Sequence, residues 1–173
     1  QSDPNTMHVE KSLKAMDLVI VQDVFLNETS KFAHVFLPGT SFLEKDGTFT
    51  NAERRINRVR PVMAAKNGKQ EWQIICELSQ AMGYEMHYDN AAAIMDEIAE
   101  ITPTFKGVSF AMLDEVGSVQ WPCNDAAPTG TPIMHVEGFV RGQGQFMETP
   151  FVPTEERSNR TFPLLLTTGR ILS

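Results

Sequence analysis

The sequence has few cysteines and none of the common catalytic or nucleotide-binding signatures. Its two cysteines, Cys76 and Cys123, lie far apart without metal-ligand spacing, so they predict neither a disulfide framework nor a zinc site. There is no P-loop, no GxGxxG, no HExxH and no CxxC, and the four histidines are scattered. The sequence therefore predicts no catalytic residue and no metal ligand within these 173 residues.

Long hydrophobic runs and an excess of positive charge are also missing. No apolar run approaches the roughly 20 residues that a membrane helix needs, and no signal peptide is visible, so we expect no membrane insertion. The formal net charge is -7, which argues against general binding to nucleic acid or to anionic membranes. The scarcity of cysteine is typical of a reduced, cytoplasmic setting.

The few basic residues are concentrated in one segment. Four of the fifteen fall within seven positions, at Arg54, Arg55, Arg58 and Arg60. One hypothesis is the solvated face of a charged strand. The other is a patch that meets phosphates or an acidic partner. The pattern itself leaves both open.

The segment 17–39 predicts a strand, a short helix and a second strand. Apolar runs at 18–21 and 35–37 suit strands that are covered on both faces, as in a parallel sheet. The residues between them leave room for a two-turn helix with Asn27 as N-cap. Gln22, Asp23 and Gly39 would then lie at the carboxyl edge of the strands, where open α/β sheets bind ligands. An amide and a carboxylate there could read a base or a sugar, or could simply cap the next turn.

Apolar residues at helical spacing and their caps predict further helices. They span 71–82, 91–101 and 109–115, and another helix follows Ser2-Asp3-Pro4. Asp46-Gly47 predicts a turn before a strand at 48–50. A β-hairpin is expected to pair 135–140 with 144–147. The polar stretch 150–160 has the composition of a domain boundary, and 162–166 predicts a strand. Because that strand lies close to the end of the sequence, we expect the chain to be a fragment of a longer polypeptide.

Several strings, in order along nearly the whole chain, resemble the large catalytic subunit of molybdenum- or tungsten-dependent formate dehydrogenases. These enzymes form part of the molybdopterin oxidoreductase, or dimethyl-sulfoxide-reductase, superfamily. The matching strings include QSDP at 1–4, LVIVQDVFL at 18–26, EKDGTFTN at 44–51, ERR at 53–55, WQII at 72–75 and LTTGR at 166–170.

The resemblance implies a particular architecture. The fold class would be α/β, with three α/β/α layers around a mostly parallel sheet, plus a β-hairpin and the first strand of a β-barrel. Residues 1–150 would be the C-terminal part of an α/β domain that binds molybdopterin guanine dinucleotide. Residues 151–161 would be a linker, and 162–173 the start of a β-barrel domain.

The resemblance also implies a cofactor and its contacts. The family binds two molybdopterin guanine dinucleotides around Mo or W, and its [4Fe–4S] cluster and metal ligands belong to other segments. The residues that match family contacts to the guanosine end are Ser2, Gln22, Asp23, Gly39 and Glu71, although position 39 is often Ala or Ser and 71 is commonly Asp. Thr168, Gly169 and Arg170 match a turn that contacts pterin and phosphate, for which an arginine fork is well suited.

By the same resemblance, the parent enzyme oxidises formate to carbon dioxide. Its partners would be other formate dehydrogenase subunits, such as iron–sulfur/flavin or hydrogenase-type electron acceptors, and the fragment alone would be inactive. Two alternatives remain open. One is a fragment of another molybdopterin oxidoreductase, such as a nitrate reductase or the large iron–sulfur subunit of an NADH dehydrogenase. The other is a non-catalytic module that docks a partner through the arginine run.

Overall fold

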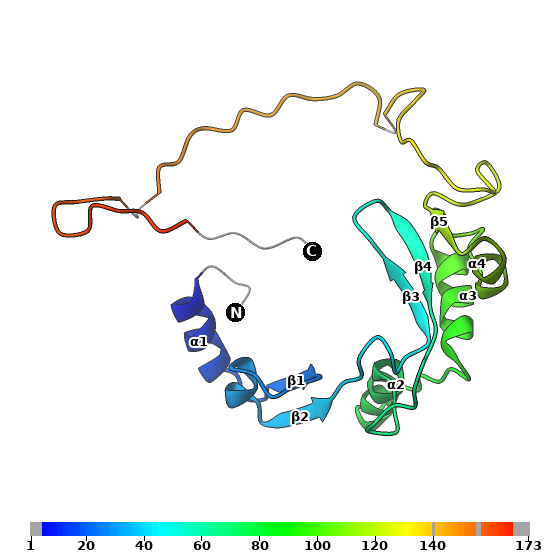
Figure 1. Ribbon diagram of the computed structural model, residues 1–173, viewed down its shortest axis with the longest axis horizontal. Coiled ribbons are helices and arrows are strands. Elements are labelled where there is room, and N and C mark those ends of the chain that lie inside the picture. The colour runs from blue at the N-terminus through cyan, green and yellow to red at the C-terminus, as the bar shows by residue number, and fades with distance from the viewer. Residues whose placement is uncertain (1–4, 140, 155–156, 168–173) are drawn as a thin grey trace. The chain divides into compact units, whose positions relative to one another are not determined.

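The computed structural model describes residues 5–139, 141–154 and 157–167 (Figure 1). The chain divides into two compact units, Gln1–Met134 and His135–Ser173. None of the helices within the described ranges is long and apolar enough to cross a bilayer. The regular elements of the described residues all fall in the first unit: α1 (Thr6–Lys14), β1 (Ile20–Asp23), the 3₁₀ helix η1 (Thr29–Phe32), β2 (Val35–Pro38), β3 (Gly47–Thr50), β4 (Arg55–Val59), α2 (Glu71–Ala81), α3 (Ala91–Ile101), α4 (Phe110–Val116) and β5 (Ser118–Gln120).

The two apolar runs near the start of the chain form a parallel pair, as the sequence predicts. Ile20 lies opposite Val35 and Asp23 opposite Pro38, so β1 and β2 end together. The connection contains the 3₁₀ helix η1, which is shorter than the expected two turns. Its cap position falls on Glu28, while the Asn27 side chain accepts the Ser30 N–H at 3.1 Å. The predicted start of α1 at residues 2–4 lies outside the described residues, and Asn5 caps this helix.

The second sheet is antiparallel, in the order β3-β4-β5. The expectation of one mostly parallel sheet is therefore wrong for the described residues. They form a mixed α/β fold with one parallel pair and one antiparallel sheet. The strand predicted at 48–50 is β3, and the turn between β3 and β4 lies at 51–54, where Asn51 Oδ1 accepts the N–H groups of Glu53 and Arg55. Arg54 completes this turn with a φ of 65°. A turn this short can join only antiparallel strands.

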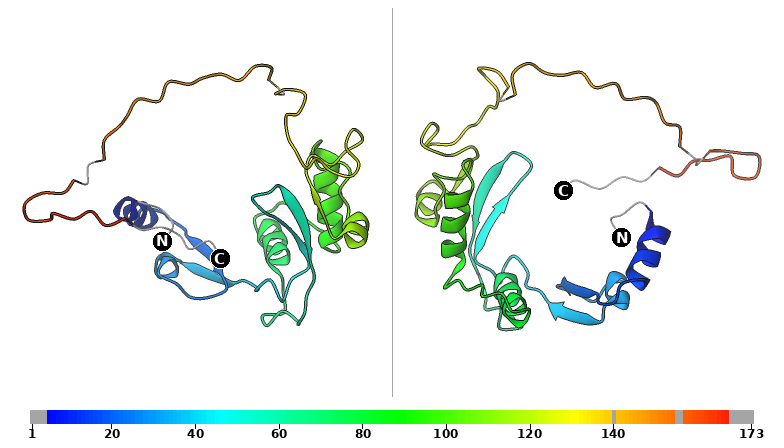
Figure 2. Two further views of the ribbon diagram at one scale, coloured as in Figure 1. Left: turned by 45° about the horizontal axis from the view of Figure 1, so that its top comes forward. Right: turned by 180° about the vertical axis from the view of Figure 1, so that it is seen from behind.

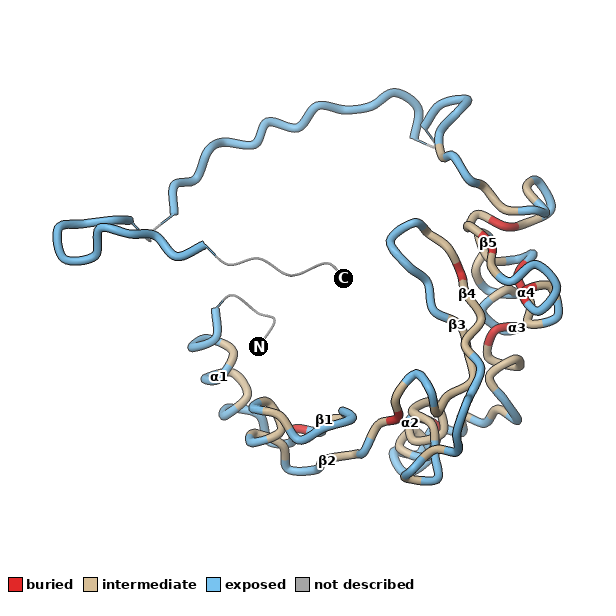
Figure 3. Tube along the Cα trace, viewed as in Figure 1, coloured by how far each residue is buried: buried red, intermediate tan, exposed pale blue. Residues whose placement is uncertain are grey.

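A small hydrophobic core lies against the antiparallel sheet. α3 and α4 run beside β4 and β5 in both views of Figure 2, and Figure 3 shows the buried positions on these elements. The thiols of Cys76 and Cys123 are both buried, and burial raises the pKa of Cys123. A buried thiol with a raised pKa is a poor nucleophile, so Cys123 lacks the environment of a reactive cysteine. The core consists of Ile56, Met95, Val108, Leu113, Val119 and Cys123.

Arginines of the run at 54–60 form ion pairs with carboxylates elsewhere in the chain. Arg58 has a side chain only 7% exposed, and it donates to Asp46 at 2.7 Å and to Asp114 at 3.0 Å. Its guanidinium carbon lies 3.9 Å from the centre of the Phe110 ring. Arg60 also pairs with Asp114. These contacts tie β4 to α4 and to the segment before β3.

The other two arginines of the run are likewise engaged. Arg54 donates to the carbonyl oxygens of Trp121, Thr131 and Pro132 and lies over the Trp121 ring. Arg55 pairs with Glu53 at 3.2 Å. Arg54 and Arg58 therefore fasten β4 to neighbouring segments, whereas Arg55 and Arg60 pair at the surface, with side chains 36% and 56% exposed.

The second unit has no helix or strand among its described residues. The expected hairpin is limited to one antiparallel bridge between Phe139 and Gly142, and Val140 lies outside the described residues. Residues 162–167 form no paired strand. The domain boundary near residue 150 and the start of a β-barrel therefore stay predictions, as does the three-layer arrangement.

We predict that Arg58→Met destabilises the chain by about 1–3 kcal/mol, because two carboxylates and two backbone carbonyls lose charged hydrogen bonds. Arg60→Met is the matched control. Its side chain is 56% exposed and pairs with one carboxylate, so its effect should stay within about 0.5 kcal/mol. Urea unfolding of both variants measures the difference. Equal destabilisation by both would show that burial of Arg58 contributes nothing.

Candidate functional site

The carboxyl edge of the β1–β2 pair meets the N-terminus of α2 around Gly39. The Gly39 N–H donates to the Asp23 carbonyl at 2.9 Å. A Cβ atom placed on Gly39 would lie 3.3 Å from the Asp23 carbonyl carbon and 3.5 Å from Glu71 Oε1. The structure thus brings together three of the predicted contact residues, Asp23, Gly39 and Glu71, although they lie far apart in the sequence.

The Glu71 carboxylate is held by two neighbours of Gly39. Oε1 accepts from the Thr40 N–H at 3.1 Å and from Lys45 Nζ at 2.5 Å, and Oε2 accepts from Thr40 Oγ1. Burial alone would raise the pKa of Glu71, but the hydrogen bonds from Lys45 and Thr40 outweigh burial and lower it. Thr40 is itself buried. Glu71 is therefore an ionised, partly shielded acceptor at the first position of a helix, where negative charge is favoured.

Asp23 has local partners as well. One carboxylate oxygen accepts the Val24 N–H at 2.7 Å and the other accepts from Asn27 Nδ2 at 2.7 Å. The capping role that the sequence left open is thus present. Because a carboxylate offers about four acceptor positions, this role leaves room for a ligand donor on the exposed side of Asp23.

Gln22 differs from these residues because its amide is incompletely bonded. Its Nε2 atom is buried and has no hydrogen-bond partner among the described residues. An unsatisfied buried donor costs about 1–3 kcal/mol. A ligand acceptor that reached this amide would remove that cost.

The structure also identifies residues that sequence reasoning did not assign to the site. Thr40 and Lys45 hold Glu71, and Asn27 holds Asp23. No spacing signal links Lys45 to Glu71, because they meet only in the folded chain. The remaining predicted contacts, Ser2, Thr168, Gly169 and Arg170, lie outside the described residues.

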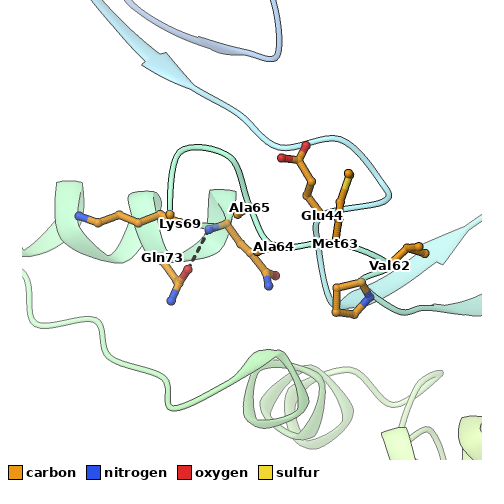
Figure 4. A pocket seen from close by; sticks show the side chains of 10 residues that line it. Glu44, Val62, Met63, Ala64, Ala65, Lys69 and Gln73 are labelled. Atoms are coloured by element: carbon orange, nitrogen blue, oxygen red, sulfur yellow. Dashed lines mark hydrogen bonds between the residues drawn. The ribbon is translucent and has the colours of Figure 1, made fainter.

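Two cavities flank the N-terminus of α2. One of about 350 Å³ is lined by Lys45, Glu71 and Trp72, among others. A second, of about 450 Å³, lies between Glu44 and the segment 61–70 (Figure 4).

Glu44, which lines the second cavity, has a lowered pKa. Its carboxylate accepts from the backbone N–H of Lys66 at 2.7 Å and of Ser41 at 2.9 Å. These bonds lower the pKa of Glu44 to about 2. Within the described ranges, no group of three or more His, Cys, Asp or Glu side chains could hold a metal ion.

Comparison of the chain with known proteins identifies its relatives. The model of the molybdopterin oxidoreductase family matches residues 1–81. The F420-dependent formate dehydrogenase 2 subunit alpha of Methanococcus maripaludis is 42% identical over 99% of this chain and 26% of its own length. Formate dehydrogenase H of Escherichia coli is 37% identical over 98% of this chain and 24% of its own length.

A solved structure shares the fold of part of this chain. The acetylene hydratase of Pelobacter acetylenicus superposes on 68% of this chain and 16% of its own, with a TM-score of 0.50 and 24% identity, which indicates a shared fold. The chain belongs to the molybdopterin oxidoreductase family, as its resemblance predicts. It spans about a quarter of the length of the curated formate dehydrogenase relatives that it matches.

We predict that Glu44→Gln makes the fold less sensitive to acid. The folded-state pKa of Glu44 is about 2, below its ordinary value of 4.5, so the stabilisation is complete above pH 4.5 and is lost as the pH falls toward 2. The variant should be less stable at pH 7, and its stability should change less between pH 4.5 and 2. Urea midpoints across this range test the prediction, and parallel curves for the two proteins would contradict it.

Proposed function

We propose that the chain is part of the catalytic alpha subunit of a formate dehydrogenase and binds the guanosine part of a molybdopterin guanine dinucleotide. The observation that carries the proposal is the similarity to formate dehydrogenase alpha subunits over nearly the whole chain, at 42% identity in one case. Family membership implies a molybdopterin-type cofactor with Mo or W. The dinucleotide form and the [4Fe–4S] cluster are parts of the proposal.

The residues around Gly39 fit the guanosine end of such a cofactor. A guanosine presents N–H groups on its base and hydroxyls on its ribose. Asp23 and Glu71 are charged acceptors for these donors, and the unsatisfied Gln22 amide offers a donor. Gly39 lets a ligand approach because it carries no side chain between the Asp23 carbonyl and the Glu71 carboxylate.

When bound, the metal–pterin group would supply the chemistry that takes two electrons and a proton from formate and leaves carbon dioxide. The residues of this chain bind and orient the nucleotide end of that group, and none of them acts on formate. The proposal also assigns the pterin and phosphate contacts to Thr168, Gly169 and Arg170 and a guanosine contact to Ser2, by resemblance. Its partners would be the electron-accepting subunits of a cytoplasmic enzyme.

The alternative functions have less support. A docking module would need the arginine run free for a partner, but Arg54 and Arg58 bind groups of this chain, which leaves Arg55 and Arg60 of the run at the surface. A nitrate reductase or an NADH dehydrogenase subunit would share the family, but the relatives described above at 37–42% identity are formate dehydrogenases.

We predict that Asp23→Asn in the complete subunit weakens cofactor retention roughly ten- to hundredfold. Charged hydrogen bonds contribute about 1.5–3 kcal/mol each, and about 1.4 kcal/mol corresponds to tenfold. The measurement is bound molybdopterin per subunit after dialysis, together with circular dichroism. Asp125→Asn, which removes an exposed carboxylate paired with Lys106, is the control. Full occupancy in Asp23→Asn would reject this contact, and a collapsed spectrum would leave Asp23 with only its capping role.

We also predict that the isolated 173-residue chain has no formate dehydrogenase activity, because no metal or cluster ligand set is predicted within it. The purified chain is assayed with formate and a dye acceptor. Turnover above background would contradict the proposal that the residues of this chain bind the cofactor but do not act on formate.

A further inference from the structure

We propose that Lys45 is a positioning residue of the nucleotide site, which orients the Glu71 carboxylate for the base of the dinucleotide. The inference rests on the proposed function and deepens it. Lys45 belongs to the segment between β2 and β3, which also carries Gly39. Its Nζ atom lies 2.5 Å from Glu71 Oε1, and the two side chains are 22% and 28% exposed.

The hydrogen bonds around Glu71 fix both of its carboxylate oxygens. The Thr40 N–H and Lys45 Nζ donate to Oε1, and Thr40 Oγ1 donates to Oε2. The backbone of Glu71 contributes a further hydrogen bond. Because Lys45 donates to Oε1, a donor of the ligand that binds Oε2 does not displace it.

The identity of residue 71 explains why a positioning residue is needed. Glutamate has one more rotatable bond than aspartate, the shorter carboxylate side chain. The longer stem lets the carboxylate sample more positions, which costs conformational entropy when a ligand fixes it. Lys45 and Thr40 fix the carboxylate before the ligand arrives, which reduces that cost on binding.

Lys45 also balances charge at this site. The charged residues that line the cavity beside Glu71 are Lys45, Asp46 and Glu71 itself, and Asp23 lies across Gly39. Asp46 is already paired with Arg58. Without Lys45, the Glu71 carboxylate would have no cationic partner, and its charge would add to that of Asp23 and of the negative phosphates of a dinucleotide. Lys45 reduces this repulsion and favours the ionised form of Glu71.

The test uses the complete subunit with Lys45→Met, Lys45→Arg, Glu71→Gln and the double variant Lys45→Met/Glu71→Gln. Bound molybdopterin per subunit is measured after dialysis at pH 7.5 and pH 5. Lys45→Met should weaken retention about tenfold, and more at pH 5, because loss of the ammonium raises the pKa of Glu71 and lets it protonate at a higher pH. Lys45→Arg should restore retention to within about twofold at both pH values. The double variant should be no weaker than Glu71→Gln alone.

Lys106→Met, which breaks an exposed ion pair with Asp125, should match the unmodified protein. The inference is overturned if Glu71→Gln weakens retention while Lys45→Met does not. It is also overturned if the two effects multiply in the double variant, or if Lys45→Arg fails to rescue. Full retention in Glu71→Gln would instead reject Glu71 as a contact of the proposed function, and the role of Lys45 with it.

Discussion

The carboxylate of Glu71 is the constraint on which the arrangement of the candidate site depends. It stands at the first residue of α2 and receives hydrogen bonds from Thr40, just beyond β2, and from Lys45, just before β3. Three stretches that are separate in the sequence are thereby fixed around one charged group. Since that group is partly shielded from water, its partners must satisfy it in the folded chain. Near Gly39, these hydrogen bonds thus join the end of β2, the first residue of α2 and the segment that leads into β3.

Local patterns in the sequence were sufficient to predict much of the first unit. The β1–β2 pair follows from two short apolar runs, and α3 from isoleucines at helical spacing with Asn90 as cap, whose side chain accepts the Ala93 N–H. α2 likewise begins at Glu71 as predicted. In each case the signal lies within a few residues, because strand pairing and helix capping depend on neighbouring groups.

Contacts between distant residues could not be predicted in this way. The arginine run has the same pattern whether it faces water or its own chain, and only folding brings Asp114 to Arg58. The same holds for the candidate site, since no pattern in the sequence indicates that Lys45 pairs with Glu71. The expected hairpin after His135 failed for a related reason. Its turn composition is favourable, but its strands have little apolar surface to pack against within the described part of that unit, where Val136 and Phe146 are exposed.

The antiparallel sheet has a consequence for the order in which the chain folds. β3 and β4 are neighbours joined by a tight turn, whereas β4 also pairs with β5, with Ile56 opposite Val119. A hairpin closes in about 1–10 μs, but the second pairing must first close a loop that contains three helices. Such non-local contacts slow folding because the entropy of the loop is lost before the contact forms. The hairpin is thus available as an early template, and the addition of β5 is the later step that completes the core.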